Sequence, residues 1–169
     1  MDETKKKLKV IPLGGLCEIG KNMTAFEYDN DLIVIDVGMA FAEEYMPGVD
    51  CVIQDYTYIR ENIDKLRGVI LTHGHEDHIG SLPYFLSEFK CPVYGGKLTI
   101  ELVRHKLHDK GVSLKGIELQ AYKNGDKVKL GTNFEAEFIR VNHSIADSYA
   151  IALKTPVGNV IHSGDFKID

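Results

Sequence analysis

Potential metal ligands are concentrated in one short segment, the run THGHEDH at residues 72–78. Imidazole and carboxylate groups are the ligands that proteins use for Zn²⁺, Mn²⁺ and iron. The glycine between His73 and His75 lets the backbone turn sharply, so both rings can converge on one ion. Asp77 and His78 begin the following helix and can face a second ion. We expect this segment to bind two divalent metal ions rather than to be a solvent-exposed loop. Zn²⁺ is the first choice of metal, and Mn²⁺ is the alternative.

Two residues later in the chain can complete the ligand shells. His143 follows an expected strand at residues 134–141, and Asp165 follows another at residues 160–162. Taken singly, each is more typical of a hydrogen-bonded turn. Together with the histidine segment, a ligand role becomes the better interpretation. A carboxylate such as Asp165 can bridge two cations, which an imidazole cannot do.

The elements that must position these ligands are short strands and two helices. Alternating or apolar runs predict strands, and longer periodic runs predict helices at 79–89 and 97–110, the second ended by Gly111. The expected strands are residues 8–13, 23–28, 32–36, 69–72, 118–122, 127–130, 134–141, 149–154 and 160–162. Strands at both ends with helices between them predict one α/β domain of two facing sheets with helices outside. The ligand loops all follow strands, so they can meet at one sheet edge.

Charge, hydropathy and cysteine content argue against a stand-alone nucleic-acid binder, a membrane protein and a disulfide-rich protein. The chain has a formal net charge of −5, whereas a stand-alone nucleic-acid binder is usually basic. A nucleic-acid substrate would therefore have to be attracted by the metal ions or by further parts of the protein. There is no apolar run long enough to cross a bilayer and no apolar segment behind the charged N-terminus. We expect a cytoplasmic protein without a membrane partner. Three widely spaced cysteines give no basis for a disulfide framework.

The ligand pattern resembles that of the metallo-β-lactamase superfamily: His73-x-His75-x-Asp77-His78, then a lone histidine, then an aspartate in a glycine turn. Flanking segments narrow the resemblance to the ribonuclease J family of β-CASP ribonucleases. These segments are residues 13–22, 72–80, 92–95, 143–148 and 162–167. Cys17 and Ala146 stand where that family commonly has glycine and proline, and neither departure touches a ligand. The resemblance extends over essentially the whole chain.

The resemblance implies a metallo-β-lactamase-type αβ/βα sandwich, of which residues 1–169 are the N-terminal half. It assigns His73, His75 and His143 to one ion, Asp77 and His78 to the other, and Asp165 to a bridge between them. It also implies that Asp36 supports the site by hydrogen bonding, although a turn-capping carboxylate is a nearly equal interpretation. A further histidine for the second ion and the β-CASP domain would lie beyond Asp169. Independently of the family, His162 fits a buried, hydrogen-bonded residue that supports the ligands better than it fits a ligand.

These expectations lead to a hypothesis of RNA phosphodiester hydrolysis. Two ions about 3.5–4 Å apart would share a hydroxide, with Asp77, His78 and Asp165 as the catalytic residues. The net positive centre would attract an anionic phosphodiester. The resemblance implies 5′-directed exonuclease and internal cleavage in RNA processing and decay, and it leaves a homo-oligomer of the full-length protein open. The alternatives are a thioester or lactam hydrolase on the same site, or an inactive metal-binding fragment.

Overall fold

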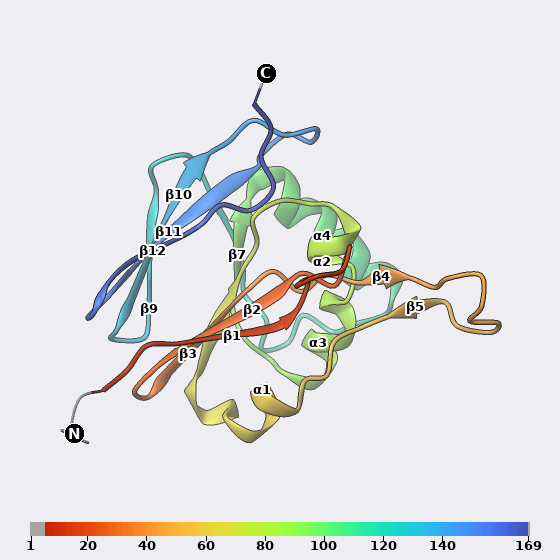
Figure 1. The fold of residues 1–169 in the computed structure, drawn as a ribbon, viewed down its shortest axis with the longest axis horizontal. Coiled ribbons are helices and arrows are strands. Elements are labelled where there is room, and N and C mark those ends of the chain that lie inside the picture. The colour runs from red at the N-terminus through yellow and green to blue at the C-terminus, as the bar shows by residue number, and fades with distance from the viewer. Residues whose placement is uncertain (1–5, 169) are drawn as a thin grey trace.

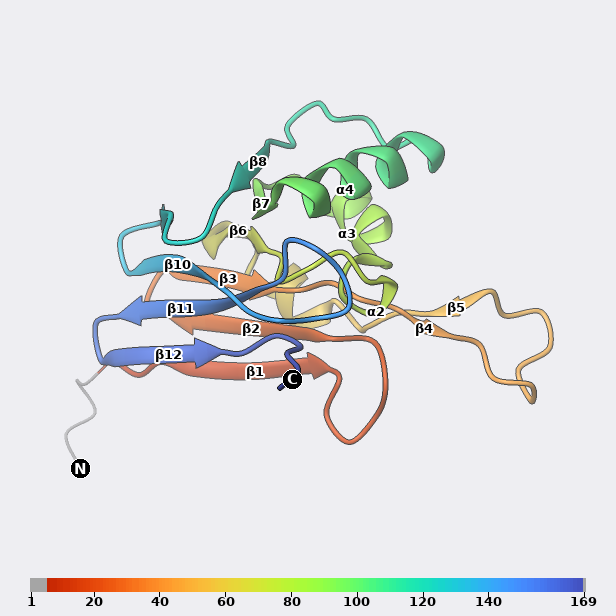
Figure 2. The same ribbon diagram turned by 90° about the horizontal axis from the view of Figure 1, so that it is seen from above.

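Two β-sheets face each other across a layer of apolar side chains in the computed structural model, which describes residues 6–168 (Figure 1). The larger sheet has the order β1 (Lys9–Gly14), β2 (Met23–Tyr28), β3 (Asp31–Ile35), β6 (Leu66–Ile70), β7 (Val93–Gly96), β8 (Leu119–Tyr122). The smaller sheet has the order β12 (Gly158–His162), β11 (Tyr149–Thr155), β10 (Phe134–Arg140), β9 (Lys127–Leu130). A short ribbon of β4 (Ala40–Phe41) and β5 (Cys51–Val52) extends away from both sheets (Figure 2).

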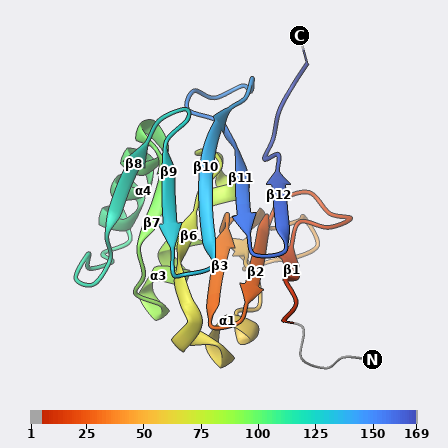
Figure 3. The ribbon, with the colours of Figure 1, turned by 90° about the vertical axis from the view of Figure 1, so that its left-hand side faces the viewer.

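The helices lie on the face of the six-stranded sheet that is turned away from the four-stranded sheet (Figure 3). They are α1 (Thr57–Glu61), a 3-10 turn at Ile63–Lys65, α2 (Glu76–Ile79), α3 (Leu82–Glu88) and α4 (Lys97–Asp109). The expected α/β class with two facing sheets is confirmed, with helices on this one side among the described residues. None of the described helices has the length and apolar character needed to span a bilayer.

The central strand β3 explains why there are two apolar cores. All five of its residues are buried. Leu32 and Val34 pack in the core beneath the helices, whereas Ile33 and Ile35 pack in the core between the sheets. Successive side chains of a strand point to opposite faces, so a strand covered on both sides is apolar along the covered stretch, here the four residues after Asp31. The continuous apolar run therefore marks a strand in the middle layer of the molecule.

Strand direction brings the ends of distant strands to one edge. β3, β6, β7 and β8 pair in parallel. β10 and β12 each pair antiparallel with β11, so they run in the same direction as each other. Asp36 directly follows β3, the histidine segment follows β6, and His143 and Asp165 follow β10 and β12. The expectation that the ligand loops sit where strands end is confirmed by this topology.

The helix expected at residues 79–89 is interrupted, and that prediction was wrong in detail. α2 ends at Ile79 and α3 begins at Leu82. Pro83 has no N–H to donate to the carbonyl of Ile79, so the helical ladder cannot continue there. The hydroxyl of Ser81 instead lies within hydrogen-bond distance of two acceptors, the carbonyl oxygen of Gly38 and the side-chain oxygen of Gln54. The break fixes α2 as a separate turn that belongs to the histidine segment.

Candidate metal centre

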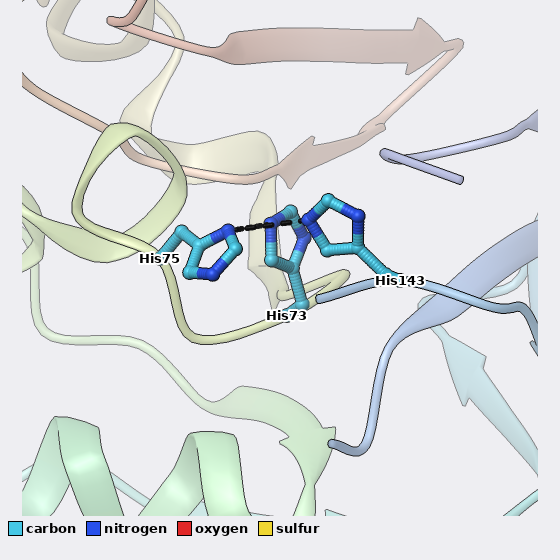
Figure 4. A group of neighbouring side chains, drawn as sticks. All are labelled: His73, His75 and His143. Atoms are coloured by element: carbon cyan, nitrogen blue, oxygen red, sulfur yellow. Dashed lines mark hydrogen bonds between the residues drawn. The ribbon is translucent and has the colours of Figure 1, made fainter. Parts of the chain in front are cut away.

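Three imidazole rings from two loops converge at the sheet edge (Figure 4). His73 Nε2 lies 3.1 Å from His75 Nδ1, and His143 Nε2 lies 3.2 Å from the same atom. Two ligands of a tetrahedral zinc ion with bonds of 2.0–2.1 Å lie about 3.3 Å apart. Both distances to His75 Nδ1 therefore match the separation of ligands that share one ion, and the three ligand atoms all lie within 4.8 Å of one another. His73 is fully buried, and His75 and His143 are both half-buried.

A second group of ligand atoms lies beside the first. His78 Nε2 is 3.5 Å from Asp77 Oδ2 and 3.5 Å from Asp165 Oδ2. One ligand atom each from His73, His78 and Asp165 also fall within 4.8 Å of one another. Asp165 thus lies where it can reach both groups, as a bridging carboxylate must. All six residues expected as ligands come together at this edge.

A buried hydrogen-bond network orients two of these rings. The Asp36 carboxylate accepts bonds from the backbone N–H and the hydroxyl of Thr72, each at 2.8 Å. It also lies 2.8 Å from His78 Nδ1. The Thr72 hydroxyl uses its only proton in the hydrogen bond to Asp36. Toward His73 Nδ1, at 3.0 Å, its oxygen can therefore act as the hydrogen-bond acceptor. Both rings then present Nε2 to the site. Asp36 has the hydrogen-bonding surroundings expected of it.

The charges of these groups follow from burial and from one another. Burial, followed by the positive charge of His78, lowers the pKa of His73 to about 4. Burial also lowers the pKa of His143, and nearby His75 adds to this. Burial would lower the pKa of His78, but Asp36 and then Asp77 raise it to about 10. At neutral pH the rings of His73 and His143 are therefore free to bind a cation, whereas a cation must displace a proton from His78.

His162 lies at the end of β12, and the expectation that it is buried was wrong, because it is only half-buried. Its Nδ1 accepts a hydrogen bond from the backbone N–H of Gly164 at 3.3 Å. This contact shapes the turn that carries Asp165, and it fits the supporting role expected for His162. The exposed His105 and His108 on α4 contact Asp109 instead.

Sequence reasoning missed two residues that contact the ligands. Thr72 was counted as the end of a strand, yet its hydroxyl directs both His73 and His78. Asn22 lies in the loop before β2, and its side chain touches Asp77 and His78. The position of Thr72 directly before the first histidine could have suggested its role. The contact of Asn22 spans 55 residues of sequence and has no local signal.

Comparison with known sequences gives a consistent group of relatives. Residues 19–168 match the family described as Metallo-beta-lactamase superfamily. Ribonuclease J of Synechocystis sp. is 52% identical over 163 residues, which are 96% of this chain and 25% of that protein. Ribonuclease J of Thermus thermophilus is 42% identical over 96% of this chain and 29% of its own length. Ribonuclease J 2 of Staphylococcus aureus is 40% identical over 97% of this chain and 29% of its own.

Solved structures agree on the fold. A protein of unknown function from Enterococcus faecalis superposes with a TM-score of 0.69 at 19% identity, over 96% of this chain and 44% of that one. Zn²⁺-bound PqqB from Methylobacterium extorquens superposes with a TM-score of 0.60 at 9% identity, over 83% of this chain and 51% of that one. At these identities the likeness concerns the fold alone. The chain spans 25% to 29% of the length of the three ribonuclease relatives named above.

Proposed function

The chain belongs to the metallo-β-lactamase superfamily, and from that premise we propose that its metal centre serves a ribonuclease that hydrolyses RNA phosphodiester bonds. The observation that carries the proposal is the convergence of His73, His75 and His143 at ligand spacing. Relatives named ribonuclease J, which match nearly the whole chain, support RNA as the substrate. The carbonyl-directed reactions of thioester and lactam hydrolases remain the rival to be tested.

The proposed ligands divide between two ions. His73, His75 and His143 would hold the first, Asp77 and His78 would hold the second, and Asp165 would bridge them. When bound, the ions supply a Lewis acid and bring the pKa of a bound water near 7. Asp36 and Thr72 keep the Nε2 atoms of His73 and His78 directed at the site. Zn²⁺ suits the three imidazoles of the first group best, and Mn²⁺ is the alternative.

The proposal extends to the protein of which this chain forms a part. Because the chain spans only 25% to 29% of the length of these relatives, we propose that residues 1–169 are the N-terminal portion of the catalytic domain and that β-CASP and C-terminal domains follow. The missing portion would supply a further histidine to the second ion and most of the RNA contacts. The net charge of −5 in this chain is consistent with RNA being attracted elsewhere or by the ions. Action on cytoplasmic RNA, with both exonuclease and endonuclease cleavage, belongs to the same proposal.

The test measures hydrolysis of three substrates by the intact protein, with zinc or manganese and after chelation. The substrates are a 5′-monophosphorylated RNA, a generic phosphodiester and a thioester. We expect metal-dependent cleavage of the RNA. His73→Ala should lower it by at least 100-fold, because this residue contacts both ligand groups.

His105→Ala is the matched control, because His105 is an exposed histidine on α4 outside the centre. Its activity should equal that of the wild type. Intact RNA in the presence of bound metal would contradict the proposal, and preferential cleavage of the thioester would favour the rival. The pattern of RNA products would separate exonuclease from endonuclease action.

A further inference from the structure

The side-chain amide of Asn22 lies against the ligands proposed for the second ion. Asn22 directly precedes β2 and is half-buried. Its Nδ2 is 3.2 Å from Asp77 Oδ2, 3.2 Å from the Asp77 carbonyl oxygen and 3.1 Å from His78 Nε2. A single amide therefore touches both residues that α2 contributes to this ion.

The backbone holds Asn22 firmly in this place. Its N–H donates to the carbonyl of Asp77 at 3.0 Å, and its carbonyl accepts the N–H of Gly38 at 3.0 Å. A side chain on Gly38 would clash with that Asp77 carbonyl, because an added Cβ would lie 1.6 Å from the oxygen. The loop before β2, the segment after β3 and the first turn of α2 thus form one closely packed unit.

The Asp77 carbonyl defines which end of the Asn22 amide faces the site. The carbonyl oxygen of Asp77 can only accept a hydrogen bond, so the NH₂ end must point toward it. The amide oxygen lies on the other side, against Gly15, where an added Cβ would be 2.6 Å from Oδ1. Because an amide nitrogen is a donor, Asn22 can orient the ligands but cannot itself bind the ion in this orientation.

We propose that Asn22 is a positioning residue that holds the Asp77 carboxylate in the orientation required by the second ion. An ionised carboxylate oxygen can accept a hydrogen bond and bind a cation at once. The amide therefore fixes Asp77 Oδ2 beside His78 Nε2, at the observed 3.5 Å, without occupying the ion's place. This inference rests on the proposed metal centre and adds to it a residue outside the ligand set.

The test compares metal binding by the intact wild-type protein with binding by Asn22→Ala and Asn22→Leu. Elemental analysis gives the number of zinc ions, and competition with a chelator gives the affinity of each. Loss of an outer hydrogen bond to a ligand typically weakens metal binding 10- to 100-fold. We expect both variants to bind the second ion 10- to 100-fold more weakly than the wild type, with unchanged affinity for the first ion. Lys21→Ala is the control, because the Lys21 side chain pairs with Glu18 and leaves Asp77 untouched.

A merely structural role would act equally with or without the Asp77 carboxylate. We therefore expect Asn22→Ala to lower the affinity for the second ion less than twofold when Asp77 is already replaced by alanine. Thermal unfolding of the metal-free proteins should differ little between wild type and Asn22→Leu. Wild-type affinity in both Asn22 variants would overturn the inference, and so would an equal loss in both backgrounds. A wild-type protein that binds no metal would overturn the proposed function as well.

Discussion

Thr72 controls the proton positions of two proposed metal ligands, His73 and His78, although it is not itself proposed as a ligand. Its hydroxyl donates to Asp36, so toward the ring nitrogen of His73, at 3.0 Å, it can act only as an acceptor. The same carboxylate lies against His78 Nδ1. One threonine and one aspartate thereby select the ring nitrogen that each of two histidines presents to an ion. Such control explains why a metal centre needs more than its ligands.

Thr72→Val removes this hydroxyl while keeping the shape of the side chain. We expect zinc affinity to fall 10- to 100-fold, because the Nδ1 of His73 loses its acceptor. The measurement is chelator competition, with circular dichroism to verify the fold. Thr99→Val is a matched control, because the buried Thr99 hydroxyl has no hydrogen-bond partner among the described residues. Equal affinities in the two variants would contradict a role for Thr72.

Glu27 makes the stability of the protein depend on pH. Burial would raise the pKa of this carboxyl, but hydrogen bonds from Lys65, Tyr58 and Lys9 lower it to about 2. A depressed pKa contributes stability above the unfolded value of 4.5, and that contribution is lost as pH falls toward 2. Glu27→Gln should lower the free energy of unfolding by about 2–3 kcal/mol at pH 7. Urea unfolding from pH 7 to pH 2.5 should show this difference shrinking, and a constant difference would refute the assignment.

At the scale of elements, Asp147 joins the loop of His143 to helix α4. Its carboxylate accepts the backbone N–H of Leu98, in the first turn of that helix, at 2.9 Å. The next residue, Ser148, closes the loop through its backbone carbonyl and its hydroxyl. Asp147 adopts φ +57°, a conformation that aspartate tolerates better than most residues. The position of His143 therefore depends on a helix that contributes no ligand.

Asp147→Ala should lower the free energy of unfolding by about 1–2 kcal/mol, because the helix loses its cap and its favourable charge. Looser packing of the loop that carries His143 should also weaken binding of the first metal ion. Asp147→Asn keeps a hydrogen-bond acceptor and should therefore lose less stability than Asp147→Ala. Asp109→Ala, at the other end of α4, should change stability by less than about 0.5 kcal/mol. Thermal unfolding and zinc titration of the three variants provide the check, and similar losses in all of them would exclude capping.

Much of the fold was predictable from the sequence because its strands carry strong local patterns. Each ligand follows such a strand, so its place at the sheet edge followed from topology. β7 was missed because it has four residues, two of them glycine, and the ribbon of β4 and β5 has only two residues in each strand. Asn22 was missed because its contacts depend on how loops pack, and no local pattern encodes that packing.

At the scale of the molecule, Asp31 connects the two sheets at the end opposite the metal centre. It begins β3, whereas Asp36 follows that strand's other end. The buried carboxylate accepts Arg67 Nε from the six-stranded sheet at 2.6 Å. It also accepts the backbone N–H groups of Thr132 and Asn133, in the turn between β9 and β10, at 2.8 and 2.9 Å. Asp31 thus links the two sheets at this end through hydrogen bonds of its side chain.

Asp31→Asn should destabilise the protein strongly, because several buried donors lose a charged acceptor. Breaking a buried, hydrogen-bonded charge pair commonly costs about 3–5 kcal/mol, so we expect a loss near the lower value. Asp29→Asn is the same substitution two residues away, at a site whose partner Lys6 is exposed. It should change stability by less than about 0.5 kcal/mol. Urea unfolding at neutral pH compares the two, and equal stability would contradict the connection.

The ligands come from both sheets, since His73 follows β6 whereas His143 and Asp165 follow strands of the smaller sheet. Zinc would therefore tie together two layers that Asp31 connects only at the far end. Saturation at 100 times the dissociation constant would stabilise the folded state by about 2.7 kcal/mol. Protease digestion with excess zinc and with chelator should give markedly different half-lives. If the proposed metal centre is correct, turnover of the protein would accelerate in a metal-starved cell, so the supply of the bound metal would govern its abundance.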